Sequence, residues 1–148
     1  MKKTSLRNNA VVIILIASVV GLIVAGYLTY VKFFHTPIYC TPGLGDCETV
    51  NTSSWSEIFG IPVALLGFLS YLVLILLILF RSKIQFVRQY GKALIFGVGL
   101  FGFLFSLYLT ALEFFVIKAF CQWCVVSALC MTVIFVASVF LVKQKQNF

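Results

Sequence analysis

The sequence predicts an all-α membrane protein, a bundle of four transmembrane helices with a long extracytoplasmic loop between the first and second spans. Of its 148 residues, 62% are hydrophobic and 10% are charged, whereas about 25% are charged in a typical soluble domain. The mean hydropathy is +1.12, and a chain this short cannot hide so much apolar surface in one core. The composition therefore excludes a soluble domain, a disordered chain and a nucleic-acid-binding protein.

Each predicted span has about 20 or more residues, because the hydrocarbon core is about 30 Å thick and a helix rises about 1.5 Å per residue. The four spans cover residues 10–31, 61–80, 93–117 and 119–142. The first two contain no charged residue, the third contains only Glu113 near its end, and the fourth holds a Cys-x-x-Cys in its first turns. With an outer loop over residues 32–60, they predict a single integral-membrane domain over residues 1–148.

The first span has one alternative interpretation, because Lys2, Lys3 and Arg7 precede it as they would precede the core of a signal peptide. Its apolar run is about 20 residues long, whereas a signal core has about 7–15. We therefore expect residues 10–31 to be an uncleaved transmembrane anchor.

The charged residues are distributed asymmetrically about these spans. One side of the membrane receives nine of the eleven basic residues: Lys2, Lys3, Arg7, Arg81, Lys83, Arg88, Lys92, Lys143 and Lys145. The other side receives the remaining charges: Lys32, Lys118, Asp46, Glu48, Glu57 and Glu113. Because Lys and Arg concentrate in cytoplasmic loops, we expect a multi-pass protein of the cell (inner or plasma) membrane with both termini in the cytoplasm. The loop over residues 32–60 is then extracytoplasmic.

This outer loop is rich in Thr, Ser, Pro, Gly and Asn, and long loops in compact domains are usually functional. Within it, residues 54–59 predict a short interfacial helix capped by Ser53 or Ser54. Trp55 would then lie at the level of the lipid headgroups. Pro62 fits the first helical position of the second span.

Four of the five cysteines are expected at one face of the membrane. Cys40 and Cys47 lie in the outer loop, and Cys121 and Cys124 lie at the outer end of the fourth span. The loop pair is expected to be mobile and exposed, so that it can meet a protein partner and then move inward. Cys130 lies six positions deeper than Cys124 and is expected to be a buried, inert, small apolar residue.

Three interpretations of the two pairs compete. Structural disulfides suit an oxidising outer face, but chain entropy gives only about 2.5 kcal/mol for the loop pair and about 2 kcal/mol for the Cys-x-x-Cys. A four-thiolate zinc site prefers ligands about two to four residues apart, and Cys40 and Cys47 have six residues between them. Redox catalysis is favoured, because two sulfurs one helical turn apart can open and close a disulfide without refolding the backbone.

The placement of the Cys-x-x-Cys supports redox chemistry. Cys121 is expected at a helix N-terminus, where free N–H groups stabilise a thiolate by under about 1 kcal/mol. Lys118, three residues earlier, would add to this effect. Cys124, one turn deeper, is expected to face the lipid side of the bundle, within reach of a membrane-soluble acceptor.

Together these residues form a pattern that covers nearly the whole chain. It consists of Cys40, Cys47, Ser53, the run Phe59-Gly60-Ile61-Pro62 with Gly67 and Tyr71 behind it, and Cys121-Gln122-Trp123-Cys124. The pattern resembles a bacterial member of the vitamin K epoxide reductase family, standalone and without a fused thioredoxin domain. The other well-known bacterial type of quinone-linked disulfide oxidase places its Cys-x-x-Cys in the first outer loop, so the order of the pairs separates the two.

The resemblance implies a four-helix bundle around a quinone, ubiquinone or menaquinone, as electron acceptor. Carried over by position, Cys40 would exchange with the dithiol of a separate extracytoplasmic thioredoxin-fold oxidase, and Cys47 would form a mixed disulfide with Cys121. Cys124 would be the thiolate beside the quinone, and the Ser53 hydroxyl would help to order the loop near it. The implied net reaction converts dithiol and quinone to disulfide and quinol through mixed disulfides. It would reoxidise the partner and support disulfide bond formation.

Two positions depart from the animal enzymes of this family, which carry an amide and a tyrosine there. This sequence has Val63 and Ala128, and neither side chain can hydrogen-bond a quinone or epoxide oxygen. Ser53 or backbone groups are then the candidate donors. The departures argue against epoxide reduction, although a vitamin K-type quinone or epoxide reductase stays an alternative, as does a non-catalytic scaffold stapled by disulfides.

Three other residues near the outer face have no assigned role. His35 is expected to be an interfacial residue at the end of the first span. Glu113 is an intramembrane acid and thus a functional candidate by default, but near the mouth of the bundle it is expected to reach the interface. Trp123 would tune access to the cysteines or anchor its helix, and no metal site is expected.

Overall fold

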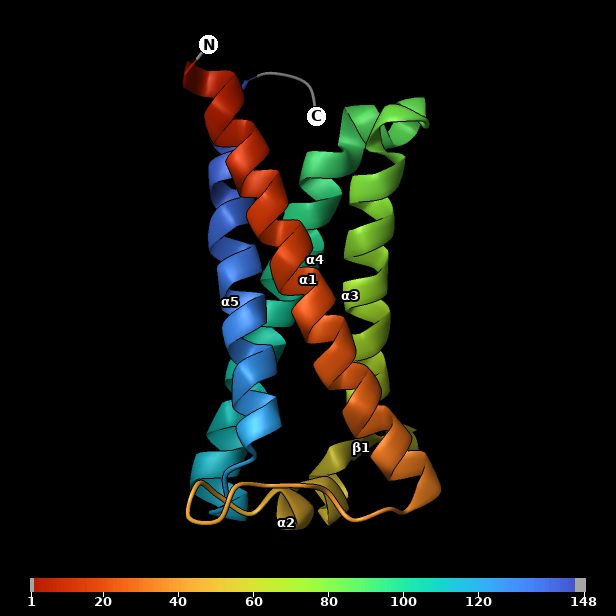
Figure 1. The fold of residues 1–148 in the computed structure, drawn as a ribbon, viewed down its shortest axis with the longest axis vertical. Helices are drawn as coiled ribbons and strands as arrows, with labels where there is room; N and C mark the ends of the chain where they lie inside the picture. The colour runs from red at the N-terminus through yellow and green to blue at the C-terminus, as the bar shows by residue number, and fades with distance from the viewer. Residues whose placement is uncertain (1, 146–148) are drawn as a thin grey trace.

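A computed structural model describes residues 2–145, in which four long helices form a bundle (Figure 1). They are α1 (Lys2–Phe34), α3 (Val63–Leu79), α4 (Gln85–Leu112) and α5 (Gln122–Lys143), with the 3₁₀ turn η2 (Phe80–Ser82) between α3 and α4. Helix α1 begins and α5 ends at the same end of the bundle, whereas the short helix α2 (Cys47–Thr52) and β1 (Glu57–Ile58) lie at the opposite end (Figure 1). The predicted all-α bundle is confirmed.

Among the described residues, four helices are long and apolar enough to cross a membrane. They cover Thr4–Phe34, Val63–Ser82, Gln85–Ile117 and Gln122–Lys143. A helix is suited to a bilayer because it satisfies its backbone hydrogen bonds internally where no water is available. The chain is therefore a multi-pass membrane protein, and the predicted number of spans agrees with the structure.

The bundle is held together by the contacts of α1 with α5 and α3, and of α4 with α5. The fully buried aliphatic side chains of this core are Ile14, Leu74, Ile95, Ile134 and Leu141. Small residues let helices approach closely in lipid. At Gly21 of α1, a Cβ atom would collide with the ring of Tyr71 of α3, so the absence of a side chain there allows the two helices to meet.

The polar segment between α1 and α3, predicted above as the outer loop and called the outer segment below, lies at the end of the bundle opposite the start of α1. Its structure differs from the one predicted. Helix α2 is capped by Asp46, whose carboxylate accepts a hydrogen bond from the Thr49 N–H at 3.1 Å. The 3₁₀ turn η1 (Ser54–Ser56) follows, and β1 then pairs antiparallel with β2 (Ile61–Pro62). Pro62 is the N-cap of α3 rather than its first helical residue, because it belongs to this hairpin and keeps an extended backbone.

Of the predicted helix over residues 54–59, only Ser54–Ser56 is helical, as the 3₁₀ turn η1 with Ser53 at its N-cap, and Glu57–Ile58 forms β1 instead. Ser53 is extended and closes α2, and its hydroxyl donates to the Val50 carbonyl at 2.7 Å. The Ser53 hydroxyl therefore donates its hydrogen to the preceding helix and makes no side-chain cap for η1. Phe59 and Gly60 both have positive φ, which turns the chain into the β1–β2 hairpin instead of a helix.

The connection from α4 to α5 also differs from the predicted start of the fourth span at residue 119. Helix α4 continues into the π-helical turn η3 (Glu113–Ile117), and Lys118 then adopts a left-handed conformation with φ 54°. A left-handed residue ends a helix, and α5 begins only at Gln122, with Cys121 as its N-cap. Apolar composition alone could not reveal this break.

Candidate active site

The loop cysteines form a disulfide. The Cα atoms of Cys40 and Cys47 are 6.0 Å apart. Cys47 begins α2 and is fully buried, whereas Cys40 is half-buried. The expectation of an exposed loop pair is therefore wrong for Cys47, because the cap at Asp46 starts a helix whose first side chain points into the bundle. Cys40 is the more accessible sulfur of the pair.

The cysteines of the Cys-x-x-Cys lie at the start of α5, and both are free thiols. Cys121 is the N-cap and is 1% exposed. The Cys124 N–H group donates to the Cys121 sulfur, with 3.4 Å between nitrogen and sulfur. The predicted position of Cys121 at a helix N-terminus is confirmed. A backbone N–H that donates to a sulfur favours the thiolate, so Cys121 is suited to attack or to leave a disulfide.

The four cysteines of the two pairs gather in one hydrophobic cluster at the end of the bundle that carries α2. Cys47 and Cys121 are buried members of this cluster, and Cys40 and Cys124 pack against it. No group of three or more His, Cys, Asp or Glu in residues 2–145 is arranged to hold a metal ion. Cys130 is half-buried rather than buried, and it packs against the core of the bundle that contains Ile134.

The residues between the two α5 cysteines reach back to the segment that carries Cys40. The indole Nε1–H of Trp123 donates to the Tyr39 carbonyl at 2.8 Å, and the Tyr39 N–H donates to the Tyr27 hydroxyl at 3.1 Å. The rings of Tyr27 and Trp123 lie with centroids 5.3 Å apart. The residue before Cys40 is therefore fixed to both α1 and α5.

Two further hydrogen bonds join the segments that carry the two cysteine pairs. The Thr41 N–H donates to the Gln122 side-chain oxygen at 3.3 Å, and the Asp46 N–H donates to the Phe120 carbonyl at 2.8 Å. Gly45 permits the second contact, because a Cβ atom there would collide with the Phe120 carbonyl. We call the bonds made by Trp123, Gln122 and Phe120 the clamp. Sequence reasoning missed the clamp, because side-chain bonds to a distant backbone leave no local pattern.

A cavity of about 640 Å³ lies among α1, α3, α4, α5 and the outer segment, and its lining is mostly apolar. Both Cys121 and Cys124 line it. The expectation that Cys124 faces lipid is therefore wrong. Residues three positions apart share one face of a helix, and this face of α5 points toward the cavity.

Hydroxyl groups provide most of the polar lining. Ser53 lines the cavity, and so do Tyr71 and Ser127, which are joined by a hydrogen bond from the Tyr71 hydroxyl to the Ser127 carbonyl at 2.8 Å. Val63 and Ala128 also line it and contribute only apolar surface. The structure thus adds Tyr71 and Ser127 to Ser53 as polar candidates for contact with a ligand.

Glu113 lies inside the bundle rather than at the interface. It is 5% exposed, and its Oε2 atom accepts a hydrogen bond from the Cys121 N–H at 3.3 Å. The expectation that this side chain reaches the interface is wrong, because the π-helical turn that begins at Glu113 points it inward. His35, at the end of α1, is exposed.

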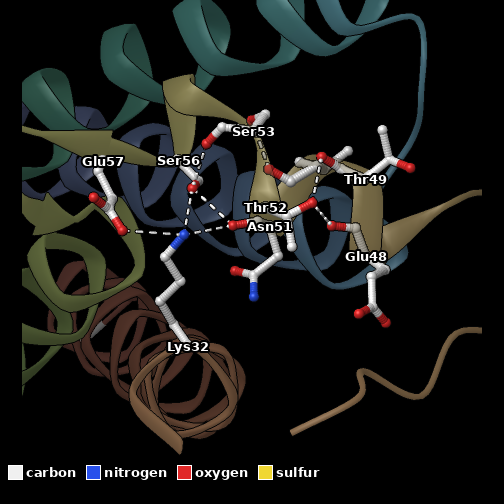
Figure 2. Close-up of polar contacts among 9 residues, drawn as sticks. Lys32, Glu48, Thr49, Asn51, Thr52, Ser53, Ser56 and Glu57 are labelled. Atoms are coloured by element: carbon white, nitrogen blue, oxygen red, sulfur yellow. Dashed lines mark hydrogen bonds and ion pairs between the residues drawn. The ribbon is translucent and has the colours of Figure 1, made fainter. Parts of the chain in front are cut away.

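One lysine holds the polar outer segment against α1 (Figure 2). The Lys32 ammonium donates to the Asn51 carbonyl at 2.7 Å and to the Ser56 hydroxyl at 2.8 Å, and it pairs with Glu57 at 3.2 Å. Its side chain is 17% exposed. Asn51 and Ser56 line the cavity beside Ser53, so these contacts help to fix one wall of it.

Comparisons with known proteins agree with this arrangement. The family model described as "Vitamin K epoxide reductase family" matches residues 12–139, which include all four cysteines of the two pairs. A curated relative, "Thiol-disulfide oxidoreductase LTO1" of Arabidopsis thaliana, is 38% identical over 45 residues. The aligned segment is 30% of this chain and 12% of that relative, so the chain covers a small part of its length.

Proposed function

The chain belongs to the vitamin K epoxide reductase family, and from this premise we propose that it is a membrane thiol–quinone oxidoreductase. The family and the plant relative both support an oxidoreductase that acts on thiols. One observation carries the proposal: Cys121 and Cys124 belong both to the cysteine cluster and to the lining of the cavity. A single site thus offers a dithiol and space for its oxidant.

The residues around the cavity fit a quinone. Its volume of about 640 Å³ falls within the range of about 300–1,000 Å³ that is usual for small-molecule sites. The apolar lining suits a quinone ring and the start of its isoprenoid tail, and the hydroxyls of Ser53, Tyr71 and Ser127 also line the cavity. To donate to a quinone oxygen, Ser53 and Tyr71 would exchange their present bonds to the Val50 and Ser127 carbonyls. When bound, ubiquinone or menaquinone would supply a two-electron, two-proton acceptor.

Electrons would enter at Cys40. A thiolate of the donor attacks the Cys40 sulfur, Cys47 leaves as a thiolate, and the donor's second thiolate resolves the mixed disulfide. The donor is then oxidised and the loop pair reduced. The proposed donor is a separate thioredoxin-fold oxidase on the extracytoplasmic side, where the loop pair would lie if both termini are in the cytoplasm of a cell-membrane protein.

Electrons would then pass to the α5 pair. The Cys47 thiolate attacks Cys121 of an oxidised Cys-x-x-Cys, Cys124 leaves as a thiolate, and Cys40 resolves the mixed disulfide. The released Cys121 and Cys124 thiolates take up two protons from water, the number that the donor dithiol gave up. The loop pair is reoxidised and the α5 pair reduced, which is the combination that the structure has. The clamp supports this exchange, because it holds the neighbours of the loop cysteines against the neighbours of Cys121. Oxidation of the two α5 thiols finally delivers two electrons and two protons to the quinone.

Assays of purified variants test this electron path. In lipid nanodiscs, with a short-chain ubiquinone or menaquinone and dithiothreitol as donor, we expect Cys121→Ala and Cys124→Ala to abolish quinone reduction. Cys130→Ala, the matched control, should retain the wild-type rate. With a thioredoxin-fold dithiol protein as donor, Cys40→Ala and Cys47→Ala should also abolish turnover, because the protein donor enters at the loop pair.

Different results would favour the alternatives. Quinone reduction that survives Cys124→Ala would refute the proposed path. Two disulfides that resist mild reductant, together with no quinone reduction by the wild type, would indicate a disulfide-stapled scaffold. Reduction of an epoxide at a rate comparable to quinone would indicate an epoxide reductase, against which the apolar side chains of Val63 and Ala128 in the cavity wall argue.

A further inference from the structure

Glu113 is unusual among the acids of this chain. It is 5% exposed, whereas the other three acids, Asp46, Glu48 and Glu57, are exposed. No cation pairs with it within residues 2–145, where Lys32 pairs with Glu57 instead. Burying an acid at membrane depth is costly, and such residues usually serve a function.

Three observations define the surroundings of the Glu113 carboxyl group. Its Oε2 atom accepts from the Cys121 N–H at 3.3 Å. The Cys124 side chain packs against the cluster to which Cys121 belongs. Glu113 lines the same cavity as both cysteines. It therefore touches the backbone of one redox cysteine, and it lines the space proposed for the quinone together with both thiols.

A purely structural role explains only part of this geometry. Accepting the Cys121 N–H needs an oxygen and no negative charge, so a glutamine would serve equally. The structural role does not explain why an ionisable group lines the same cavity as two thiols. The titratable groups that share this space are the two α5 thiols and the Tyr71 phenol, and the nearby Lys118 is exposed.

We propose that Glu113 is a catalytic proton acceptor that takes the Cys124 thiol proton and returns it to the reduced quinone. This inference rests on the proposed function. As the S–S bond to Cys121 forms, the Cys124 S–H bond breaks and its proton moves to the Glu113 carboxylate, while the electron pair passes to the quinone. Glu113 would pass this proton, and Cys121 its own proton, to the two oxygens of a bound quinone, which would give quinol and restore the carboxylate.

The backbone places Glu113 for this task. Helix α4 changes to a π-helical turn at this residue, and such turns occur frequently at functional sites. The irregular segment that follows Lys118 then returns Cys121 to the carboxyl group eight residues earlier in the chain. The break between α4 and α5 therefore brings a proton acceptor and a dithiol together.

The test compares Glu113→Gln with the wild type in nanodiscs. Glutamine keeps an oxygen for the Cys121 N–H and cannot take up a proton. General acid–base catalysis contributes about 10²–10⁴-fold, so we expect quinone reduction to fall by about 100-fold or more. Reduction of the Cys40–Cys47 disulfide by dithiothreitol, without quinone, should change less than about twofold. The wild-type rate of quinone reduction should fall toward acid pH as the carboxylate is protonated. We call this fall the acid limb of the pH profile, and the profile of Glu113→Gln should lack it.

Glu48→Gln, which alters an exposed acid of α2, is the matched control and should retain the wild-type rate and pH profile. Glu113→Asp keeps a carboxyl group and should retain the acid limb, with a lower rate of quinone reduction. If Glu113→Gln does not fold, the aspartate variant tests whether the carboxyl group accepts the proton. A Glu113→Gln rate within twofold of wild type, or an aspartate variant without the acid limb, would overturn the inference while the proposed function stands. A wild type that reduces no quinone would overturn both.

Discussion

Replacing Trp123 with phenylalanine removes one hydrogen bond of the clamp and keeps an aromatic ring beside Tyr27. The lost bond is the one from the indole Nε1–H to the Tyr39 carbonyl, 2.8 Å long. A hydrogen bond contributes about 0.5–1.5 kcal/mol net, and Tyr39 is 70% exposed, so water can replace the donor and no buried group is left unpaired. In the docked state, the clamp holds the segment around Cys40 against α5, and in the open state this contact is broken. We expect Trp123→Phe to destabilise the docked state by about 1 kcal/mol, which raises the ratio of open to docked molecules about fivefold.

The labelling rate of Cys121 measures this ratio. Cys121 is 1% exposed and packs in one cluster with Cys47, so a water-soluble maleimide reaches its sulfur only when the loop opens. In a background with Cys124→Ser and Cys130→Ser, with the loop disulfide intact, Cys121 is the one free thiol. We expect Trp123→Phe to increase its labelling rate about fivefold, by the same free-energy argument.

A matched control separates the clamp from a general effect on the outer surface. Tyr30→Phe also removes one polar hydrogen from an aromatic residue, at an exposed position of α1 outside the clamp, and should leave the labelling rate within twofold. Gln122→Ala removes the other side-chain bond of the clamp and should accelerate labelling by a similar factor. If Trp123→Phe labels no faster than Tyr30→Phe, the clamp does not hold the loop.

Three further predictions concern the surroundings of the site. Lys32→Met keeps the length of the stem but loses two hydrogen bonds and an ion pair; it should cost about 2 kcal/mol and lower the apparent melting temperature in detergent by about 4–8 °C. The hydrogen bonds from Thr49 lower the pKa of Asp46 below its ordinary value of 3.8, so its cap on α2 is complete above that value and is lost as the pH falls through the lower, folded-state pKa. Hydrogen exchange at the Thr49 amide should accelerate over that acid range in the wild type but not in Asp46→Ala. Tyr71→Phe removes the bond to Ser127 and should destabilise the bundle by about 1 kcal/mol in thermal unfolding, whereas unchanged stability would show that this bond contributes nothing.

The spans could be predicted from the sequence because lipid imposes a simple requirement. A long apolar stretch has no alternative to a helix in a bilayer, and this fixes the number and approximate position of α1, α3, α4 and α5. The boundary at the start of α5 could not be predicted this way, because Lys118 and Cys121 interrupt the helix through backbone geometry and not through polarity. Hydropathy does not report a left-handed residue.

The outer segment was predicted less well because its signals compete. Both Asp46 and Ser53 are residues that favour helix N-caps, and in the structure the aspartate is the one whose side chain caps a helix, by accepting from the Thr49 N–H. The aspartate was available as a signal in the sequence. The β1–β2 hairpin was not, since its turn depends on positive φ at Phe59, a conformation that an aromatic residue rarely adopts.

The gathering of the cysteines followed from topology, but their detailed surroundings did not. Placing all four at one membrane face needed only the order of spans and loops. The inward direction of Cys124 and Glu113 depends on how α4 and α5 are rotated about their axes. In a span that is apolar on every side, no polar face reveals that rotation.

The missing side chain at Gly21 has a consequence for ligand choice. Gly21 does not line the cavity, but the Tyr71 ring that rests on it does. A methyl group at residue 21 would push the Tyr71 ring into the cavity and so reduce the cavity volume. Preference between a bulkier and a slimmer quinone can therefore change through a residue that never touches either molecule.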